Sequence, residues 1–134
     1  MAGKSASLGV LKEENVEIPM RDGVVLRANI FRPDATGPHP AILERTPYGK
    51  AAGGMERFVR AGYVVVAQDS RGRYASDGEY VPFSVENTGD AEDGYDTVEW
   101  LARQPFCNAK VGTMGSSYNG WMQWELARLR PPHL

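Results

Sequence analysis

Two adjacent serines, Ser116 and Ser117, stand in the stretch GTMGSSYNGW, between a strand-like segment and a segment with helical character. A serine on a sharp strand-to-helix turn exposes its hydroxyl. The N–H of the next residue then lies at the positive end of the helix dipole, where it can stabilise an oxyanion. Such a turn usually has the pattern G-x-S-x-G. Around Ser117 the first glycine is Gly115, but Asn119 occupies the second position and Gly120 follows one residue later. The pattern therefore indicates a nucleophile for acyl transfer, with one departure.

Two other interpretations of the serine pair stay open. Taking Ser116 as the nucleophile would place Met114 and Tyr118 at the glycine positions, which fits the pattern less well. Alternatively, either serine could act only as the N-cap of the following helix. The sequence favours Ser117 as the nucleophile and leaves the N-cap role open.

Other candidate motifs fit known sites poorly. Lys50 in YGK lacks the glycine and the hydroxyl residue of a phosphate loop, since Arg45 and Ala51 stand at those positions. The glycines near the serine pair lack the third glycine of a dinucleotide site at its usual spacing. His39 and His133 have no ligand spacing, so the sequence predicts neither a metal nor a cofactor.

The composition is typical of a globular domain. Of the 134 residues, 42% are hydrophobic and 24% are charged, and the net charge of −2 favours neither nucleic acid nor an anionic membrane as a partner. No apolar run reaches the roughly 18 residues of a spanning helix. The first residues have no apolar core of signal-peptide length, so we expect a cytoplasmic location. The single cysteine, Cys107, is expected to be a small, partly buried thiol.

The elements that must position the serines follow from apolar periodicity and turn residues. Strands are predicted at 16–20, 24–33, 41–46, 63–69 and 110–115, and helices at 55–62, 90–104 and 118–130. Asp22-Gly23 predicts a tight hairpin turn and Gly62 a helix end. This order predicts an α/β fold with a mixed, mostly parallel sheet and helices on both faces. Residues 1–14 are predicted to be a flexible tail and 15–134 the folded domain.

Several segments, in this order, resemble one family. They are VEIPMRDGVVLRANIFRP, RTPYGK, FVRAGYVVVAQDSRGRYASDGEY, DAEDGYDTVEWLARQPFCNAKVG and GSSYNGWMQW. The chain resembles the N-terminal part of the catalytic domain of cocaine esterase-like hydrolases, a group that includes X-prolyl dipeptidyl peptidases and α-amino-acid ester hydrolases. The resemblance runs from about residue 15 to the C-terminus and implies an α/β-hydrolase fold whose later strands are missing.

The resemblance also implies a function and site residues. It implies hydrolysis of ester or amide acyl bonds in a small acyl ester or peptide, without a cofactor. Ser117 would be the nucleophile, and the backbone N–H of Tyr118 one oxyanion donor. The hydroxyl of Tyr48, in RTPYGK, would be the second donor, and a phenol suits this task because it stays neutral at pH 7.

Two charged features are expected to be structural. Arg71 is expected to hold its loop by pairing with Asp69 or another local acid. The acidic run at 90–96 is expected to be a solvated helix N-terminus rather than a cation site.

A base and an acid for the nucleophile are hard to find in this sequence. In α/β-hydrolases both follow the serine, and after Ser117 only Glu125 and His133 are candidates. Glu125 would lie about 12 Å along the helix, and His39 lies upstream in a loop. We therefore expect an N-terminal fragment of a longer hydrolase that is inactive alone. The alternative is a non-catalytic module that self-associates through the exposed edge of strand 110–115.

Overall fold

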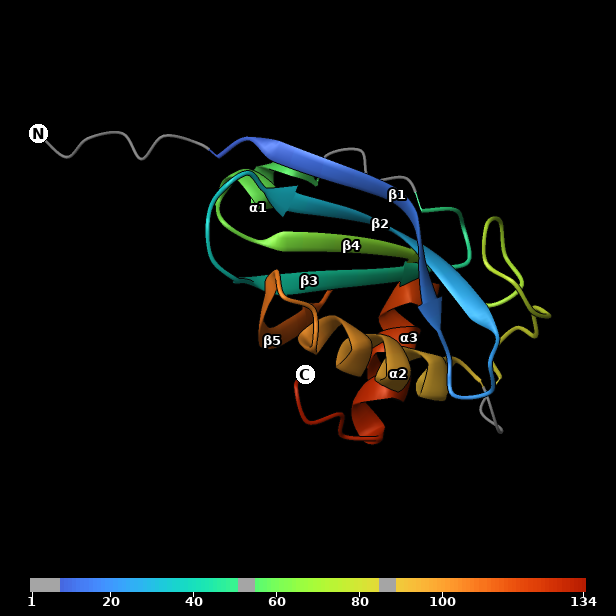
Figure 1. Ribbon diagram of the computed structural model, residues 1–134. Coiled ribbons are helices and arrows are strands. Elements are labelled where there is room, and N and C mark those ends of the chain that lie inside the picture. Colours follow the sequence, from blue (N-terminus) through green and yellow to red (C-terminus); the bar gives the residue numbers. More distant parts are fainter. Residues whose placement is uncertain (1–7, 51–54, 85–88) are drawn as a thin grey trace, which may run out of the picture.

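Five strands form one mixed sheet with the order β1-β2-β4-β3-β5 (Figure 1). This computed structural model describes residues 8–50, 55–84 and 89–134. In chain order the elements are β1 (Val10–Pro19), β2 (Val25–Pro33), β3 (His39–Thr46), α1 (Glu56–Arg60), β4 (Val64–Asp69), α2 (Asp90–Ala102), β5 (Cys107–Thr113) and α3 (Tyr118–Arg128). The β1–β2 and β2–β4 pairs are antiparallel, and the β3–β4 and β3–β5 pairs are parallel. The mixed sheet is confirmed, but the described strands pair equally in both senses rather than mostly in parallel.

The strand β4 lies at the centre of the sheet and is buried along its whole length. Its run of valines has no alternation because both faces of the sheet are covered. The helices α2 and α3 cover one face, and α1 covers the other (Figure 1). The predicted helices on both faces are confirmed.

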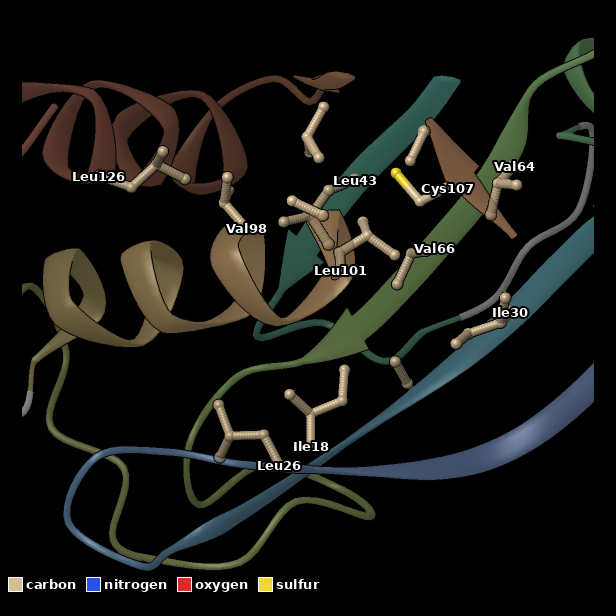
Figure 2. Close-up of a cluster of buried hydrophobic side chains, with 14 of the residues drawn as sticks. Ile18, Leu26, Ile30, Leu43, Val64, Val66, Val98, Leu101, Cys107 and Leu126 are labelled. Atoms are coloured by element: carbon tan, nitrogen blue, oxygen red, sulfur yellow. The ribbon is translucent and has the colours of Figure 1, made fainter. Parts of the chain in front are cut away.

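The larger core lies between the sheet and α2 and α3. Val98 and Leu101 of α2 point toward Leu43 of β3 and Val66 of β4 (Figure 2). These four side chains are at most 1% exposed. Burying an aliphatic side chain of this size contributes roughly 1.5–3 kcal/mol, so the core fixes α2 against the parallel strands.

The strand β1 begins earlier than expected. It starts at Val10, so the predicted tail over residues 1–14 is wrong for its last five positions. Most of these positions are exposed. An edge strand that faces water needs no apolar alternation, because its backbone hydrogen bonds to β2 keep it in the sheet. The register breaks near Asn15, which has φ +52°. Residues 1–7 lie outside the described residues.

Both predicted glycine turns are confirmed. Gly23 has φ +87°, and its N–H donates to Met20 O at 2.9 Å, which closes the hairpin. Gly62 has φ +103° and follows α1, where Tyr63 N–H donates to Phe58 O at 3.0 Å. A left-handed glycine with such a bond ends a helix, as the sequence predicts.

The strand β5 lies at an edge of the sheet and begins at Cys107, three residues before its predicted start. The strand is irregular at Ala109, which has φ +67°. This irregularity interrupts the apolar alternation by which the sequence would indicate a strand. On this strand Val111 N–H donates to His133 O at 3.0 Å, so the end of the described chain partly covers the edge. Self-association through this edge stays a prediction. None of the helices in the described ranges has the length and apolar character that crossing a membrane requires.

Candidate active site

Ser117 stands on the turn between β5 and α3 in an unusual backbone conformation. Its φ is +57° and its ψ is −125°, and its side chain is exposed. Such a conformation costs a non-glycine residue roughly 1–3 kcal/mol. Gly115 has φ +139°, and a Cβ there would lie 2.6 Å from Asn119 Cβ, so this position requires glycine. A Cβ at Gly120 would meet only Gly115 O, at 3.6 Å, so the displaced second glycine is not demanded by space.

The hydroxyl of Ser117 does not cap the helix. Ser117 occupies the N-cap position of α3, and its carbonyl accepts from Trp121 N–H at 3.0 Å. Among the described residues its side chain makes no capping hydrogen bond, which argues against a purely capping role. Tyr118 follows as the first helical residue, where a backbone N–H has no acceptor within its own helix. Ser117 Oγ and Tyr118 N–H are thus both unused by the helix.

The side chain of Tyr118 is buried and bonded at its hydroxyl. The hydroxyl donates to Asp90 Oδ2 at 2.9 Å and accepts from Phe83 N–H at 2.9 Å. Asp90 is itself held by Arg45, whose Nη1 donates to Asp90 O at 2.9 Å and whose Nη2 lies 3.9 Å from Asp90 Oδ1. We call Arg45, Asp90 and Tyr118 the buried triplet; it joins β3, α2 and α3 below the serine turn.

Burial dominates the electrostatics of the buried triplet. It raises the pKa of Asp90, which the positive charge of Arg45 and the hydrogen bond from Tyr118 oppose. It also raises the pKa of the Tyr118 phenol and lowers the pKa of the Arg45 guanidinium. Each group offsets part of the cost of burying another, so removing one leaves its partners unsatisfied.

Tyr48 lies beside Tyr118 near the C-terminal ends of the parallel strands β3 and β5. The two rings are 6.5 Å apart between centroids and nearly perpendicular, and Tyr48 is exposed. Tyr48 N–H donates to Thr46 Oγ1 at 3.0 Å, and Lys50 Nζ lies 2.8 Å from Asp69 Oδ2, which holds the loop after β3. Because β3 and β5 are parallel, their C-terminal ends lie on the same side of the sheet. Tyr48, which follows β3, therefore lies near the serine turn, which follows β5.

An exposed aromatic residue also borders the serine turn. The Phe83 ring lies 4.6 Å from that of Tyr118 and 5.0 Å from that of Trp121. Its φ is +54°, and the residue is 58% exposed. Sequence reasoning missed Phe83 and the roles of Arg45 and Asp90. The sequence offered no specific signal for Arg45, because Glu44 and Thr46 flank it in the same strand.

Arg71 and the acidic run differ from expectation in detail. Arg71 Nη2 lies 2.8 Å from Asp93 Oδ1, and its Nη1 lies 2.8 Å from Asp22 Oδ2. These bonds raise the pKa of Arg71. Its structural role is confirmed, whereas Asp69 as a partner is wrong. The predicted solvation of the acidic run is wrong for Asp90 and Asp93, which are 7% and 1% exposed. They are buried because they face arginines from other elements.

The candidate base and acid are engaged elsewhere. His133 Nδ1 lies 2.8 Å from Glu99 Oε1 at the end of α2. Glu125 Oε2 accepts from Arg128 Nε at 3.0 Å. His39 begins β3, and its Nε2 is buried without a partner among the described residues. At about 3.3 Å per residue, the length of β3 separates His39 by roughly 20 Å from the strand end near which the serine turn lies.

Within residues 8–50, 55–84 and 89–134, no three histidine, cysteine, aspartate or glutamate side chains converge in a way that could hold a metal ion. Cys107 is a free thiol that is more deeply buried than the partly buried one predicted, and burial raises the pKa of its thiol. A buried thiol with a raised pKa is a poor nucleophile, so Cys107 does not compete with Ser117.

Comparisons with known proteins agree with this fold. The S. aureus CocE/NonD family hydrolase structure superposes with a TM-score of 0.84 at 34% identity, covering 93% of this chain and 26% of that chain. An α-amino acid ester hydrolase superposes with a TM-score of 0.82 at 35% identity, covering 100% of this chain and 25% of that chain. The fold is therefore that of the N-terminal part of these α/β-hydrolases.

The sequence comparisons identify the family. The cocaine esterase of Rhodococcus sp. (strain MB1 Bresler) is 46% identical over 121 residues, covering 84% of this chain and 20% of that protein. A putative serine esterase of Mycobacterium bovis is 32% identical over 128 residues, covering 77% of this chain and 20% of that protein. The chain thus spans 20% of the length of these curated relatives. Residues 22–134 match the model of the X-Pro dipeptidyl-peptidase (S15 family), and the chain belongs to that family.

Proposed function

We propose that this chain carries the nucleophile and the oxyanion donors of a serine hydrolase that cleaves ester or amide acyl bonds. Ser117 Oγ attacks the carbonyl carbon, and Tyr118 N–H and the Tyr48 hydroxyl stabilise the negative oxygen that forms. The observation that carries the proposal is the backbone of Ser117, with φ +57° on an exposed turn that leaves its hydroxyl out of the helix cap. Strain at an exposed polar residue is typical of functional sites.

The reaction needs a base that takes the Ser117 proton. The base accepts this proton as the Oγ–carbon bond forms, and it gives the proton to the leaving alcohol or amine as the bond between the carbonyl carbon and that leaving group breaks. Water, deprotonated by the same base, then attacks the acyl-enzyme; the Oγ–carbon bond breaks, the proton returns to Ser117 Oγ and the carboxylic acid is released. His133 is bound to Glu99, and His39 lies at the far end of β3. The proposed base is therefore neither His133 nor His39, and other polypeptide supplies it.

Esters are the substrates that we place first. The curated relatives carry the names cocaine esterase and putative serine esterase, and one structural relative is an α-amino acid ester hydrolase. The matched family is described by X-Pro dipeptidyl-peptidase, which makes an X-Pro peptide the second candidate. Both substrates react through the same acyl-enzyme step.

A fluorophosphonate probe tests the proposal directly. The purified chain is incubated with the probe, with and without imidazole as an external base, and intact mass is measured. We expect the probe to label one site, and imidazole to accelerate this labelling. Ser117→Ala should abolish the labelling, whereas the matched control Ser116→Ala should be labelled like the original chain. A folded chain that stays unlabelled in imidazole, or a Ser117→Ala variant labelled like the original chain, would contradict the proposal.

A further inference from the structure

The Tyr118 side chain is fixed more firmly than packing between two helices requires. Both functions of its hydroxyl are used, one toward Asp90 Oδ2 and one by Phe83 N–H, each at 2.9 Å. Its ring lies 4.6 Å from that of Phe83 and 5.3 Å from that of Trp121. Rotation about the Cα–Cβ bond would move the hydroxyl and break both hydrogen bonds. Because the ring and the backbone N–H share one Cα, fixing the ring also restricts the direction of the N–H.

We infer that Asp90 and Arg45 are positioning residues that hold the Tyr118 backbone N–H, and the Ser117 turn before it, in the geometry that the oxyanion requires. The inference rests on the proposed function. Neither Asp90 nor Arg45 touches the reacting atoms. Both act through the Tyr118 side chain, Asp90 by its carboxylate and Arg45 by fixing Asp90.

Stability alone does not account for the buried triplet. Arg45 and Asp90 are 4% and 7% exposed, and apolar side chains of similar volume in their place are often neutral or stabilising. Arg45 Nη2 has no hydrogen-bond partner among the described residues, but the directional bonds from Tyr118 to Asp90 Oδ2 and from Arg45 Nη1 to Asp90 O restrict the three residues to one arrangement. The packing around it is tight, since a Cβ at Gly94 of α2 would lie 2.6 Å from Arg45 Nη1. A glycine in the middle of a helix is unfavourable, so its presence here indicates that the close approach of Arg45 matters.

The backbone of Ser117 needs such support. A conformation with φ +57° relaxes unless the surrounding structure determines it. Tyr118 is the next residue, and its bonds reach α2, the loop at Phe83 and, through Asp90, β3. The buried triplet is therefore placed where it can maintain the strained turn.

Backbone amide hydrogen exchange tests this positioning without requiring activity. The variants are Tyr118→Phe, which removes only the hydroxyl, and Asp90→Ala, which removes its acceptor. The matched control is Asp96→Ala on the same helix, which loses an ion pair with Arg21 instead. We expect exchange of the Trp121 amide, which donates to Ser117 O at 3.0 Å, to accelerate roughly tenfold in both variants, the effect of losing one buried hydrogen bond. Exchange in β5 and in the last turn of α3 should stay unchanged, as should exchange at all three places in Asp96→Ala.

Inactivation by the fluorophosphonate probe in imidazole gives a second readout. We expect the maximal inactivation rate to fall roughly 10- to 100-fold in Tyr118→Phe and Asp90→Ala, as for a small misplacement of catalytic groups, with the concentration for half-maximal rate unchanged. Unchanged exchange of the Trp121 amide in both variants would overturn the inference, and so would acceleration that spreads evenly over the chain. If the original chain is not labelled, the proposed function fails, while the exchange data still decide whether the buried triplet positions Tyr118.

Discussion

At the scale of single residues, Ser117 combines a reactive group with an unfavourable backbone. Its φ of +57° and ψ of −125° suit glycine better than any residue with a Cβ. The side chain is retained at an energetic cost, which is expected where a hydroxyl must project from a tight turn. This cost can be measured separately from the chemistry.

We predict that Ser117→Gly is more stable than Ser117→Ala by about 1 kcal/mol, because glycine relieves the strain that alanine keeps. Unfolding in urea, followed by circular dichroism, measures the difference. The matched pair is Ser116→Gly and Ser116→Ala, since Ser116 is not among the described residues with positive φ. At that position glycine should bring no gain. Equal stability of the two Ser117 variants would mean that the turn is unstrained.

Asp90 should give the protein a characteristic pH dependence. Its carboxyl is surrounded by Arg45, Tyr118, Asp93 and Glu125, and burial raises its pKa above the about 3.9 of an unfolded chain. The native state then holds a proton that the unfolded state has lost. The stability from this group is fully present below the unfolded pKa and is lost as pH rises through the folded pKa. We predict that the free energy of unfolding of the original chain, minus that of Asp90→Asn, falls as pH rises above about 4.

Asp22 provides the opposite control. Its hydrogen bonds with Arg71 lower its pKa, so its contribution is present above the unfolded pKa and is lost as pH falls through the folded pKa. Urea unfolding at several pH values from about 3 to 8 separates the two behaviours. A difference for Asp90→Asn that rises with pH, like that for Asp22→Asn, would show that Asp90 is stabilised as a carboxylate.

At the scale of elements, Gly94 allows α2 to pack closely against its neighbours. A Cβ at Gly94 would lie 2.6 Å from both Arg45 Nη1 and Leu126 Cβ, so the helix approaches β3 and α3 closely at this point. Gly120 of α3 offers a contrast, because a Cβ there meets only Gly115 O at 3.6 Å. The same change at the two helical glycines should therefore have opposite effects.

We predict that Gly94→Ala lowers the free energy of unfolding by about 1–3 kcal/mol through overpacking, despite the better helix propensity of alanine. Gly120→Ala should leave stability unchanged or raise it by up to about 1 kcal/mol. Thermal and urea unfolding of both variants check this. A stabilised Gly94→Ala would show that α2 can move away from Arg45 at little cost.

At the scale of the whole molecule, the described sheet has β5 at one edge, and only Val111 N–H is bonded there by the end of the described chain. A strand with an uncovered edge is a template for another strand. The described fold covers 26% of the structure of the S. aureus hydrolase, so the relatives contain much more polypeptide than these residues. Self-pairing through β5 is the alternative to a catalytic role.

We predict reversible self-association of the chain at high concentration through this edge. Gly112→Lys should weaken it by placing a charge on the exposed strand, and Gly112→Ala is the matched control. A Cβ at Gly112 would lie 4.0 Å from Ala41 O, so both variants fit the fold. Light scattering after size-exclusion chromatography measures the mass. A compact monomer at every concentration would contradict self-association.

Local signals were sufficient for part of this structure. The hairpin at Gly23, the helix end at Gly62 and the tight turn at Gly115 depend on backbone angles that glycine adopts readily, so the residue type reveals them. The buried strand β4 and the amphipathic helix α2 follow from the spacing of their apolar residues. The expectation that Ser117 lies on an exposed strand-to-helix turn came from such signals, together with the resemblance to a family.

The partners of the charged and aromatic side chains were decided only by the tertiary structure. Tyr48 meets Tyr118, Arg71 meets Asp22, and Arg45 meets Asp90, each across a long stretch of sequence. These meetings depend on the order of strands in the sheet and on which helix covers which face, and no local pattern encodes them. An aspartate at a helix start has the same sequence signature whether water or an arginine faces it. The sequence therefore determined where the chain turns and which serine stands on the turn before α3, and the fold determined its backbone conformation and what holds that residue in place.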